Sequence, residues 1–576
     1  MEVGRDILKN NGSRGNRRKT APANQPMGLN NNIFRQPLFW LAMVLGGLIL
    51  SPLLWYGAGM DQALYLYGAW VWKNFHLPPY IGAWDSNFPG IFIIHRLAMA
   101  MFGESILGFR ILDLLVQLSC LAMIFALARR LTGSDAAAFI TCLLYGFYYL
   151  GRGRWDAGQR DAFVFAALLA ALFCSVVLDR RLWLRAVLTG LFAGLAFLIR
   201  PTYGLAWVVF GGFFLCRAVR AKRGAALSEL LVFGFFCLAP CLLVVFYYWH
   251  GGWLREMYRA VILYNFEVYS RLKPPASAQT APGFLVHKLY SLFGSQPVIF
   301  FLALLSILFQ GKSGAGLNRS REIFQLLLIF ICLSAFSYLL LGKDLQYQLI
   351  PFWGFAVILS SAGLSAVGTF FKRIFPGIAG RVLAWTFYLM VCVFMFVSIP
   401  PNWTVFAFRQ SFRELDAAYL SGTGASDELL SNSHYLPARY LQTVVGKDDG
   451  VEVFGAHPLI AFLLKKKLPS RFAMVQHLMF CPPGSGLSLM QRQGIEEYTR
   501  AVMSARPRFF VIAEQGIYFG TCLSRPSFKQ GLAELFPELS TFLERNYMPL
   551  KKISQTEIFE LKPGIEQGRP GNGGKP

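Results

Sequence analysis

The segment Gly57–Gly103 reads GAGMDQALYLYGAWVWKNFHLPPYIGAWDSNFPGIFIIHRLAMAMFG. It directly follows an apolar run long enough to cross a bilayer, and Asp61 stands near its start. A carboxylate at a membrane boundary is costly unless water, a partner or a substrate compensates its charge. This acidic and strongly aromatic segment is therefore the first candidate for a functional loop.

Apolar runs recur throughout the first 400 residues, and we expect about eleven of them to be membrane spans. They are Pro37–Tyr56, Leu107–Ala128, Ala136–Leu150, Ala162–Leu178, Leu184–Ile199, Tyr203–Cys216, Leu227–Trp249, Pro297–Gln310, Ile323–Leu341, Leu349–Ser365 and Val382–Ile399. The chain has 576 residues, of which 55% are hydrophobic and 15% charged, and its mean hydropathy is +0.45. These values exclude an ordinary soluble domain and predict a polytopic α-helical membrane protein.

Lysine and arginine gather in alternate loops between the apolar runs, and the formal net charge is +24. The clusters are Arg14–Lys19, Arg129–Arg130, Arg180–Arg185, Arg217–Arg223, Lys312–Arg321 and Lys372–Arg381. This alternation is typical of the positive-inside rule, so we expect these loops and the N-terminus in the cytoplasm. We therefore predict an integral protein of a bacterial-type plasma (inner) membrane, in contact with lipid and with no nucleic-acid partner.

The composition divides the chain into four parts. Residues 1–32 form a polar, basic tail that we expect to be disordered and cytoplasmic, and residues 33–400 form the multispan domain with its first outer loop at 57–103. Residues 401–562 are predicted to be an extracytoplasmic α/β domain, and 563–576 a flexible tail. Strands are expected at Val451–Gly455, Arg508–Ile512 and Ile553–Leu561, and helices at His457–Lys466, Ile495–Ser504 and Gly531–Arg545. The ten cysteines have no metal-type spacing, and we expect no disulfide framework.

Acidic residues concentrate in the loops on the side opposite the basic clusters. Asp61, Asp85, Asp156 and Asp161 lie there, together with Arg160, Arg200 and Lys343. Four of these residues have an alternative, structural interpretation. Asp61 and Asp161 could cap helices, Asp85 could form an Asx turn before Pro89, and Arg200 could extend to the membrane interface. Mixed charges interleaved with tryptophan at one boundary favour a site for a polar substrate presented by the membrane.

These residues also resemble a known family. Asp61 followed by LYLYGAWVW resembles the first loop of the membrane glycosyltransferases of the GT-C superfamily, in particular the protein O-mannosyltransferase and aminoarabinose transferase group. DSNFPG at Asp85–Gly90 is similar to the second segment of that loop, which in the group reads D-x-K-P-P-G. Further similar elements are GQRDAF at 158–163, FLIRPTYGL at 197–205, GKDLQYQLIPFW at 342–353 and AHPLIAFLLKKKLPSRF at 456–472. The resemblance implies a GT-C-like helical domain of about 11 transmembrane helices followed by an α/β domain.

The chain departs from the family pattern at two positions. The group has a second acid directly after the first, where this chain has Gln62, and a lysine in the second segment, where this chain has Asn87. The resemblance therefore carries over Asp61 but neither a second carboxylate nor a phosphate-binding lysine. No cofactor is certain, and the sequence does not support a divalent metal.

The resemblance implies an inverting glycosyltransferase that moves a sugar from a polyprenyl-phosphate donor to a lipid, glycan or protein acceptor on the outer face. Asp61 is the expected catalytic base, and Arg160, Arg200 and Lys343 are the expected ligands of the donor phosphate. Asp85, Asp156, Asp161, Tyr65 and Tyr347 are the expected contacts of sugar or acceptor. The alternatives are a lipid-linked glycan ligase or polymerase and a transporter or flippase. A transporter would place ionisable groups near span centres and show inverted repeats.

Overall fold

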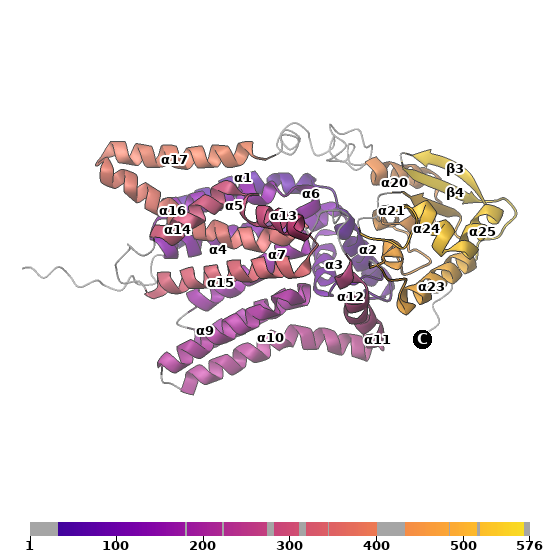
Figure 1. Ribbon diagram of the computed structural model, residues 1–576, viewed down its shortest axis with the longest axis horizontal. Coiled ribbons are helices and arrows are strands. Elements are labelled where there is room, and N and C mark those ends of the chain that lie inside the picture. Colours follow the sequence, from indigo (N-terminus) through magenta and orange to yellow (C-terminus); the bar gives the residue numbers. More distant parts are fainter. Residues whose placement is uncertain are drawn as a thin grey trace, which may run out of the picture.

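The computed structural model describes residues 33–178, 181–221, 224–272, 281–309, 318–343, 345–399, 432–482, 484–514, 519–553 and 555–568. A bundle of long helices forms most of the molecule, and a smaller domain with a four-stranded sheet packs at one end of it (Figure 1). The predicted tail at 1–32 and the predicted boundary between residues 400 and 401 lie outside the described residues.

Nine helices in the described ranges are long and apolar enough to cross a membrane. A tenth candidate is a pair, Leu285–Phe293 and Pro297–Phe309, bent by 75°. The helices of the bundle are α1 (Pro37–Leu50), α4 (Ile106–Thr132), α5 (Asp135–Leu150), α7 (Arg160–Val177), α8 (Leu182–Ile199), α9 (Leu205–Ala221), α10 (Gly224–His250), α13 (Ala281–Phe293), α14 (Pro297–Phe309), α15 (Asn318–Leu341), α16 (Ile350–Ile374) and α17 (Ile378–Val397). Each predicted apolar run falls on a helix. The first span, Pro37–Trp55, joins α1 to a short 3-10 helix, Ser51–Trp55. The helices α5 and α14, on two other runs, do not reach the length of a span by themselves. The chain is an integral membrane protein, as predicted.

The connections between these helices alternate between the two ends of the bundle. The turns from α9 to α10 and from α16 to α17 lie at the end away from the sheet domain (Figure 1). Basic residues flank these turns, including Arg220 at the end of α9 and Lys372 and Arg373 at the end of α16. These two basic turns lie at the opposite end of the bundle from the first predicted outer loop.

The loop that follows the first span folds into two helices, α2 (Met60–Phe75) and α3 (Gly90–Phe102). Most of α2 is buried, because its aromatic face packs against α3 and against the C-terminal domain. Gly90 begins α3 where a side chain would collide with the backbone of α8, since a Cβ there would lie 2.7 Å from the Leu198 carbonyl oxygen. The absence of a side chain at Gly90 thus lets the DSNFPG segment lie directly against the end of α8.

The C-terminal domain contains a mixed sheet in the order β1-β2-β4-β3. Strands β1 (Val451–Gly455) and β2 (Phe509–Ala513) are parallel, and β4 (Thr556–Leu561) is antiparallel to both β2 and β3 (Tyr547–Ile553). Both strands are fully buried. The sequence of β2 is wholly apolar, whereas β1 contains Glu452, which accepts a hydrogen bond from the Tyr498 hydroxyl over 3.0 Å. The helices are α20 (Asn432–Val444), α21 (Pro458–Leu464), α22 (Gln476–Met479), α23 (Leu489–Ala505), α24 (Phe528–Leu535) and α25 (Pro537–Asn546).

Three expectations for this domain are wrong. The strand predicted over Ile553–Leu561 begins only at Thr556, because Ile553 is the last residue of β3, a strand that was not predicted. The helix predicted over Gly531–Arg545 is two helices, because Pro537 cannot continue α24 and instead begins α25. Cys481 and Cys522 form a disulfide, although no disulfide framework was expected. The bridge joins two loops 41 residues apart in the sequence, where backbone hydrogen bonding also pairs Cys481 with Gly520.

Candidate functional site

A cavity of about 210 Å³ lies where the bundle meets the C-terminal domain. Its walls come from the start of α2, the DSNFPG loop, the segment before α7, the turn before α16 and the C-terminal domain. The lining residues are Met60, Asp61, Leu64, Asp85, Ser86, Asn87, Trp155, Asp156, Gln159, Arg160, Tyr269, Leu345, Gln346, Tyr347, Met474, Gln476, His477, Phe480 and Phe519. Five of the nine residues expected to form a site therefore line one cavity: Asp61, Asp85, Asp156, Arg160 and Tyr347.

Asp61 lies in the first turn of α2, where the partial positive charge of a helix N-terminus favours a carboxylate. Its position excludes a capping role, because Gly59 is the N-cap and Gln62 closes the capping box. The Tyr347 hydroxyl donates a hydrogen bond of 3.4 Å to Oδ2 of Asp61. The carboxylate is partly exposed to the cavity, so it remains accessible to a ligand.

Arg160 begins α7 and reaches across the cavity wall to two neutral partners. Its Nη1 donates to the side-chain oxygen of Asn87, and its Nη2 donates to the Tyr347 hydroxyl over 3.2 Å. No carboxylate of the described residues lies within the ion-pair distance of 4 Å from this guanidinium. Among the residues that the structure describes, Arg160 is therefore a cation without a paired anion, beside the carboxylate of Asp61.

Asn87 links the acidic and basic sides of the cavity. Its amide nitrogen donates to Oδ2 of Asp85 over 2.7 Å and to the Tyr65 hydroxyl over 3.1 Å, while its oxygen accepts from Arg160. Oδ1 of Asp85 accepts from the backbone N–H of Ser86 over 2.7 Å. A lysine at position 87 could not accept from Arg160, so the amide is what joins Asp85 to the arginine.

Burial raises the pKa of the two central carboxyls. The pKa of Asp85 is raised to about 6, mainly by burial, with hydrogen bonds from Asn87 and the charge of Arg160 opposing the rise. Burial also raises the pKa of Asp61, while Arg160 and His477 lower it and the negative charge of Asp85 raises it further. Burial likewise raises the pKa of Asp156, to about 6. Carboxyls with raised pKa values are suited to accept a proton near neutral pH.

The structure places the remaining predicted residues behind the cavity wall. Tyr65 is buried beneath Asn87. Arg200 and Asp161 form a buried ion pair with each other at the ends of α8 and α7. Nζ of Lys343 donates to the backbone carbonyls of Tyr269 and Leu272, and burial lowers the pKa of this lysine to about 8. Arg200, Asp161 and Lys343 all have partners within the protein, so these residues stabilise the walls of the cavity.

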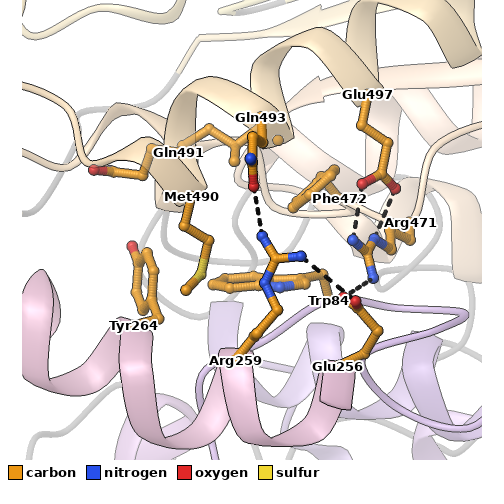
Figure 2. A pocket seen from close by; sticks show the side chains of 12 residues that line it. Trp84, Glu256, Arg259, Tyr264, Arg471, Phe472, Met490, Gln491, Gln493 and Glu497 are labelled. Carbon is orange, nitrogen blue, oxygen red and sulfur yellow. Dashed lines mark hydrogen bonds and ion pairs between the residues drawn. The ribbon is translucent and has the colours of Figure 1, made fainter. Parts of the chain in front are cut away.

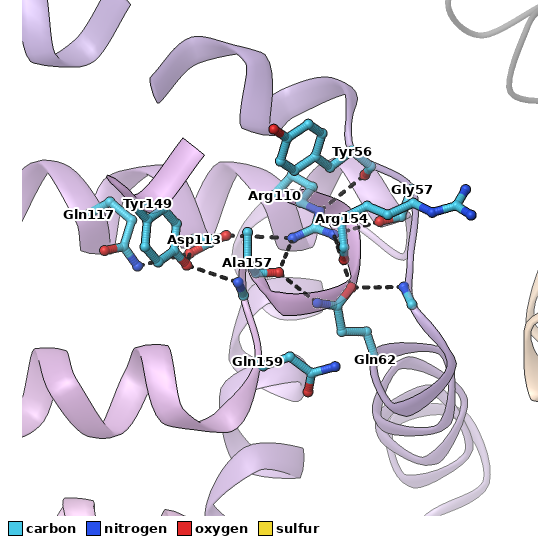
Figure 3. A network of polar contacts seen from close by, with 12 residues as sticks. Tyr56, Gly57, Gln62, Arg110, Asp113, Gln117, Tyr149, Arg154, Ala157 and Gln159 are labelled. Atoms are coloured by element: carbon cyan, nitrogen blue, oxygen red, sulfur yellow. Dashed lines mark hydrogen bonds and ion pairs between the residues drawn. The ribbon is translucent and has the colours of Figure 1, made fainter. Parts of the chain in front are cut away.

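Arg110 supports the cavity from inside the bundle (Figure 3). This fully buried side chain of α4 donates to the carbonyl oxygens of Tyr56 (3.1 Å), Gly57 (2.5 Å), Arg154 (3.3 Å) and Ala157 (2.8 Å). These carbonyls belong to the segments that lead into α2 and α7. The guanidinium therefore fixes the distance between the helices that carry Asp61 and Arg160.

Gln62 belongs to the Arg110 network and does not line the cavity. Its oxygen accepts from Arg110 over 2.9 Å and from the Gly59 N–H over 3.0 Å, and its nitrogen donates to the Ala157 carbonyl over 2.7 Å. A carboxylate at this position could not donate to Ala157. Gly158 completes the network with a positive φ of 74°, where a Cβ would lie 2.8 Å from Nη1 of Arg110.

The cavity does not fit a metal ion bridged by two neighbouring acids. Gln62 occupies the second position of such a pair, and its side chain is fully engaged with Arg110, Gly59 and Ala157. Within the ranges that the structure describes, no group of three or more His, Cys, Asp or Glu residues is placed to hold a metal.

Sequence reasoning missed the contribution of the C-terminal domain to this cavity. Gln476, His477 and Phe480 lie on or beside α22, and Phe519 lies on the loop held to it by the disulfide of Cys481. The segment Ala456–Phe472 was quoted for its resemblance, and these residues follow it in the chain. No local motif marks them, because only tertiary packing brings α22 to the membrane domain.

A second, apolar cavity of about 600 Å³ lies beside the first. Its walls come from the ends of α8 and α10, from α11 (Leu254–Tyr258) and from Phe88 and Pro89. Because Asn87 lines the polar cavity and Phe88 the apolar one, the two meet along a single stretch of backbone. The arrangement suits a ligand with a polar head and an apolar chain.

Residues 86–248 match the family model described as dolichyl-phosphate-mannose-protein mannosyltransferase. The matched range contains Asn87 and Arg160 and begins after Asp61. Among curated proteins, no sequence matches the chain significantly.

The fold is similar to that of ArnT from Cupriavidus metallidurans bound to undecaprenyl phosphate. The TM-score is 0.53 at 12% identity, over 92% of this chain and 98% of ArnT. ArnT in the apo state gives a TM-score of 0.51 at 12% identity, over 90% of this chain and 98% of that one. The oligosaccharyltransferase of Archaeoglobus fulgidus, tethered with an acceptor peptide, gives a TM-score of 0.46 at 11% identity. The match covers 83% of this chain and 69% of the oligosaccharyltransferase. The likeness to ArnT confirms the predicted GT-C fold.

The Arg110 network generates a prediction about stability. Replacing Arg110 with methionine leaves Asp113, 3.6 Å from its Nη1, as a buried charge without its cation and leaves four carbonyls without their donor. We expect a loss of about 3–5 kcal/mol in the free energy of unfolding, measured by denaturation of the detergent-solubilised protein. Arg181→Met, at an exposed residue of the opposite end, is the matched control. Equal stability of the two variants would contradict the role assigned to Arg110.

Proposed function

We propose that this membrane protein with the GT-C fold transfers a sugar from a polyprenyl-phosphate donor to an acceptor hydroxyl. The observation that carries the proposal is Arg160 beside Asp61, held by Asn87 and Tyr347 and by no anion of the described residues, in a cavity that adjoins an apolar one. A partly buried cation that contacts only neutral groups among the described residues is costly, and an anionic ligand would compensate it. The mannosyltransferase family match and the likeness to ArnT, whose structure contains undecaprenyl phosphate, support the same class of donor.

The donor would lie across the two cavities. Its isoprenoid chain would occupy the apolar cavity between α8, α10 and α11. Its phosphate would then reach the level of Asn87, where the guanidinium of Arg160 offers a planar pair of donors. The sugar would extend toward Asp61, Asp85 and Asp156. Arg200 and Lys343 were expected as further phosphate ligands, but their engagement with Asp161 and with backbone carbonyls favours Arg160 alone.

Asp61 would act as the general base. As the acceptor oxygen attacks the anomeric carbon, its O–H bond breaks and the proton passes to the carboxylate of Asp61. The new bond joins the anomeric carbon to the acceptor oxygen, and the bond to the phosphate oxygen breaks with its electron pair. Arg160 would stabilise the charge on the departing polyprenyl phosphate. A single displacement inverts the configuration at the anomeric carbon.

Two features support an extracytoplasmic C-terminal domain. The basic loops lie at the opposite end of the bundle, which is the end expected in the cytoplasm. The disulfide of Cys481 and Cys522 belongs to the C-terminal domain, and disulfides persist in oxidising compartments. We therefore propose that transfer occurs on the outer face of a bacterial-type inner membrane, on a lipid, glycan or protein acceptor.

Asp61→Asn tests the proposed base. The amide keeps the shape of the side chain but cannot accept a proton, so we expect transfer from radiolabelled polyprenyl-phosphate sugars in membranes to fall about 10²–10⁴-fold. Glu104→Gln is the matched control, because Glu104 pairs with Lys73 and lies outside the cavity. Undiminished transfer by Asp61→Asn would refute the base. Saturable solute uptake without transfer by the wild type would favour a transporter.

Arg160→Gln tests the phosphate site. Losing charge-assisted hydrogen bonds to phosphate is expected to weaken binding of polyprenyl phosphate about 10–100-fold, while Arg160→Lys retains the charge and is expected to bind with intermediate affinity. Binding is measured directly on the purified protein. Arg96→Gln is the control, since Arg96 stacks on Trp72 outside the cavity. Wild-type affinity of Arg160→Gln for polyprenyl phosphate would exclude this site.

The transfer rate is expected to fall as the pH is lowered. Asp61 acts only when ionised, and burial raises its pKa, so activity is lost at a higher pH than an exposed aspartate would give. Asp85→Asn removes a negative charge that raises the pKa of Asp61, so the acid limb of the kcat/KM profile should move to lower pH. A profile that is flat from pH 4 to 7, or a shift to higher pH in Asp85→Asn, would contradict this assignment.

A further inference from the structure

The C-terminal domain contributes an imidazole directly to the cavity. Nε2 of His477, on α22, lies 3.9 Å from Oδ1 of Asp85, beyond hydrogen-bonding distance. The side chain is 8% exposed and lines the cavity with Asp61 and Asp85. The imidazole of His477 and the carboxylate of Asp85 therefore face one another but are not hydrogen-bonded.

His477 is held rigidly from both domains. Its ring lies among the aromatic rings of Trp84 and Phe480, with centroids 5.4 and 5.6 Å away. Its backbone carbonyl accepts from the hydroxyl of Tyr264 over 2.7 Å and from Nε2 of Gln491 over 3.1 Å. A side chain fixed in this way is preorganised for binding, because little rotamer entropy remains to be lost.

Hydrogen bonds and ion pairs join the membrane domain to the C-terminal domain around His477 (Figure 2). Arg471 donates to the Tyr80 carbonyl and to Glu256 of the membrane domain, each over 2.9 Å, and to Glu497 over 2.8 Å. Arg259 donates to the side-chain oxygen of Gln493 across the same contact over 2.6 Å, and the backbone N–H of Trp84 donates to the backbone carbonyl of Arg471 over 2.7 Å. Packing alone could retain a histidine here, but packing does not require its Nε2 to face a carboxylate across an open cavity.

The protonation state of the His477 imidazole indicates which kind of ligand group it binds. Burial lowers the pKa of His477 to about 4, so at neutral pH the imidazole is uncharged and offers one N–H and one lone pair. Such a group recognises a hydroxyl, which can donate to one partner and accept from the other. Asp85, across the gap, is an acceptor when ionised.

We propose that His477 is a substrate-binding residue that hydrogen-bonds a hydroxyl group placed between it and Asp85. The inference rests on the proposed function and deepens it, because it makes the C-terminal domain part of the transfer site. The hydroxyl belongs either to the donor sugar or to the acceptor. The chemistry of recognition is the same for both, and binding measurements separate them.

The test compares wild type, His477→Ala and His477→Gln as full-length proteins. Binding is measured for a polyprenyl-phosphate monosaccharide and for polyprenyl phosphate without sugar, and transfer kinetics are recorded for donor and acceptor. His477→Ala is expected to weaken one of these interactions about tenfold, the effect of one lost hydrogen bond. His477→Gln retains a donor and an acceptor and should recover part of the loss. His250→Ala, at an exposed histidine ending α10, is the control.

The outcomes distinguish the two sources of the hydroxyl and the two proposals. Weaker binding of the glycosylated lipid, with unchanged binding of bare polyprenyl phosphate, assigns His477 to the donor sugar. Unchanged binding of both lipids with a raised acceptor KM assigns it to the acceptor. Wild-type binding and kinetics in His477→Ala would overturn this inference alone, and equal loss for both lipids would show a general packing defect and also overturn it. Absence of transfer by the wild type would overturn the proposed function instead.

Discussion

The guanidinium of Arg110 is the interaction on which the site depends. A charged side chain inside a membrane helix is tolerated only when the protein surrounds it with partners. Here four backbone carbonyls and the oxygen of Gln62 supply them. Those carbonyls can meet at one point only if the segments before α2 and α7 converge on α4. Satisfying one buried charge therefore brings Asp61 and Arg160 to the same cavity.

The other basic side chains near the cavity fall into two groups: those whose charge the protein itself compensates, and Arg160. Arg200 has Asp161, and Lys343 has two backbone carbonyls, so each is compensated within the fold. Arg160 instead contacts an amide and a hydroxyl, which orient it without neutralising it. A site that binds an anionic substrate needs this difference, because a cation already paired with a carboxylate must lose that partner before it can bind phosphate. The neutral partners thus keep the positive charge of Arg160 available.

Local sequence patterns predicted the bundle and most of the C-terminal domain. A membrane span is a local property of about 20 consecutive residues, so every expected apolar run falls on a helix. The buried strands β1 and β2 could likewise be predicted from their composition. Features set by distant contacts were not predictable. The disulfide of Cys481 and Cys522 follows no motif, and His477 reaches the cavity only through the packing of the C-terminal domain on α2 and α11. Asp61 and Arg160 were identified because boundary charges are unusual in themselves, whereas Arg110 lies within an apolar run.

The two departures from the family pattern compensate each other. A carboxylate at position 62 and a lysine at position 87 would bring one negative and one positive charge, and this chain has an amide at both places. The amide of Gln62 donates and accepts at once, so it bridges Ala157 and Arg110 as no carboxylate could. The amide of Asn87 does the same between Asp85 and Arg160. The paired replacement leaves the net charge of the site unchanged, while it leaves Arg160 as the cation that faces the cavity. In the proposed mechanism, phosphate recognition would thereby fall to Arg160 at the start of α7, next to Asp61 as the proposed base.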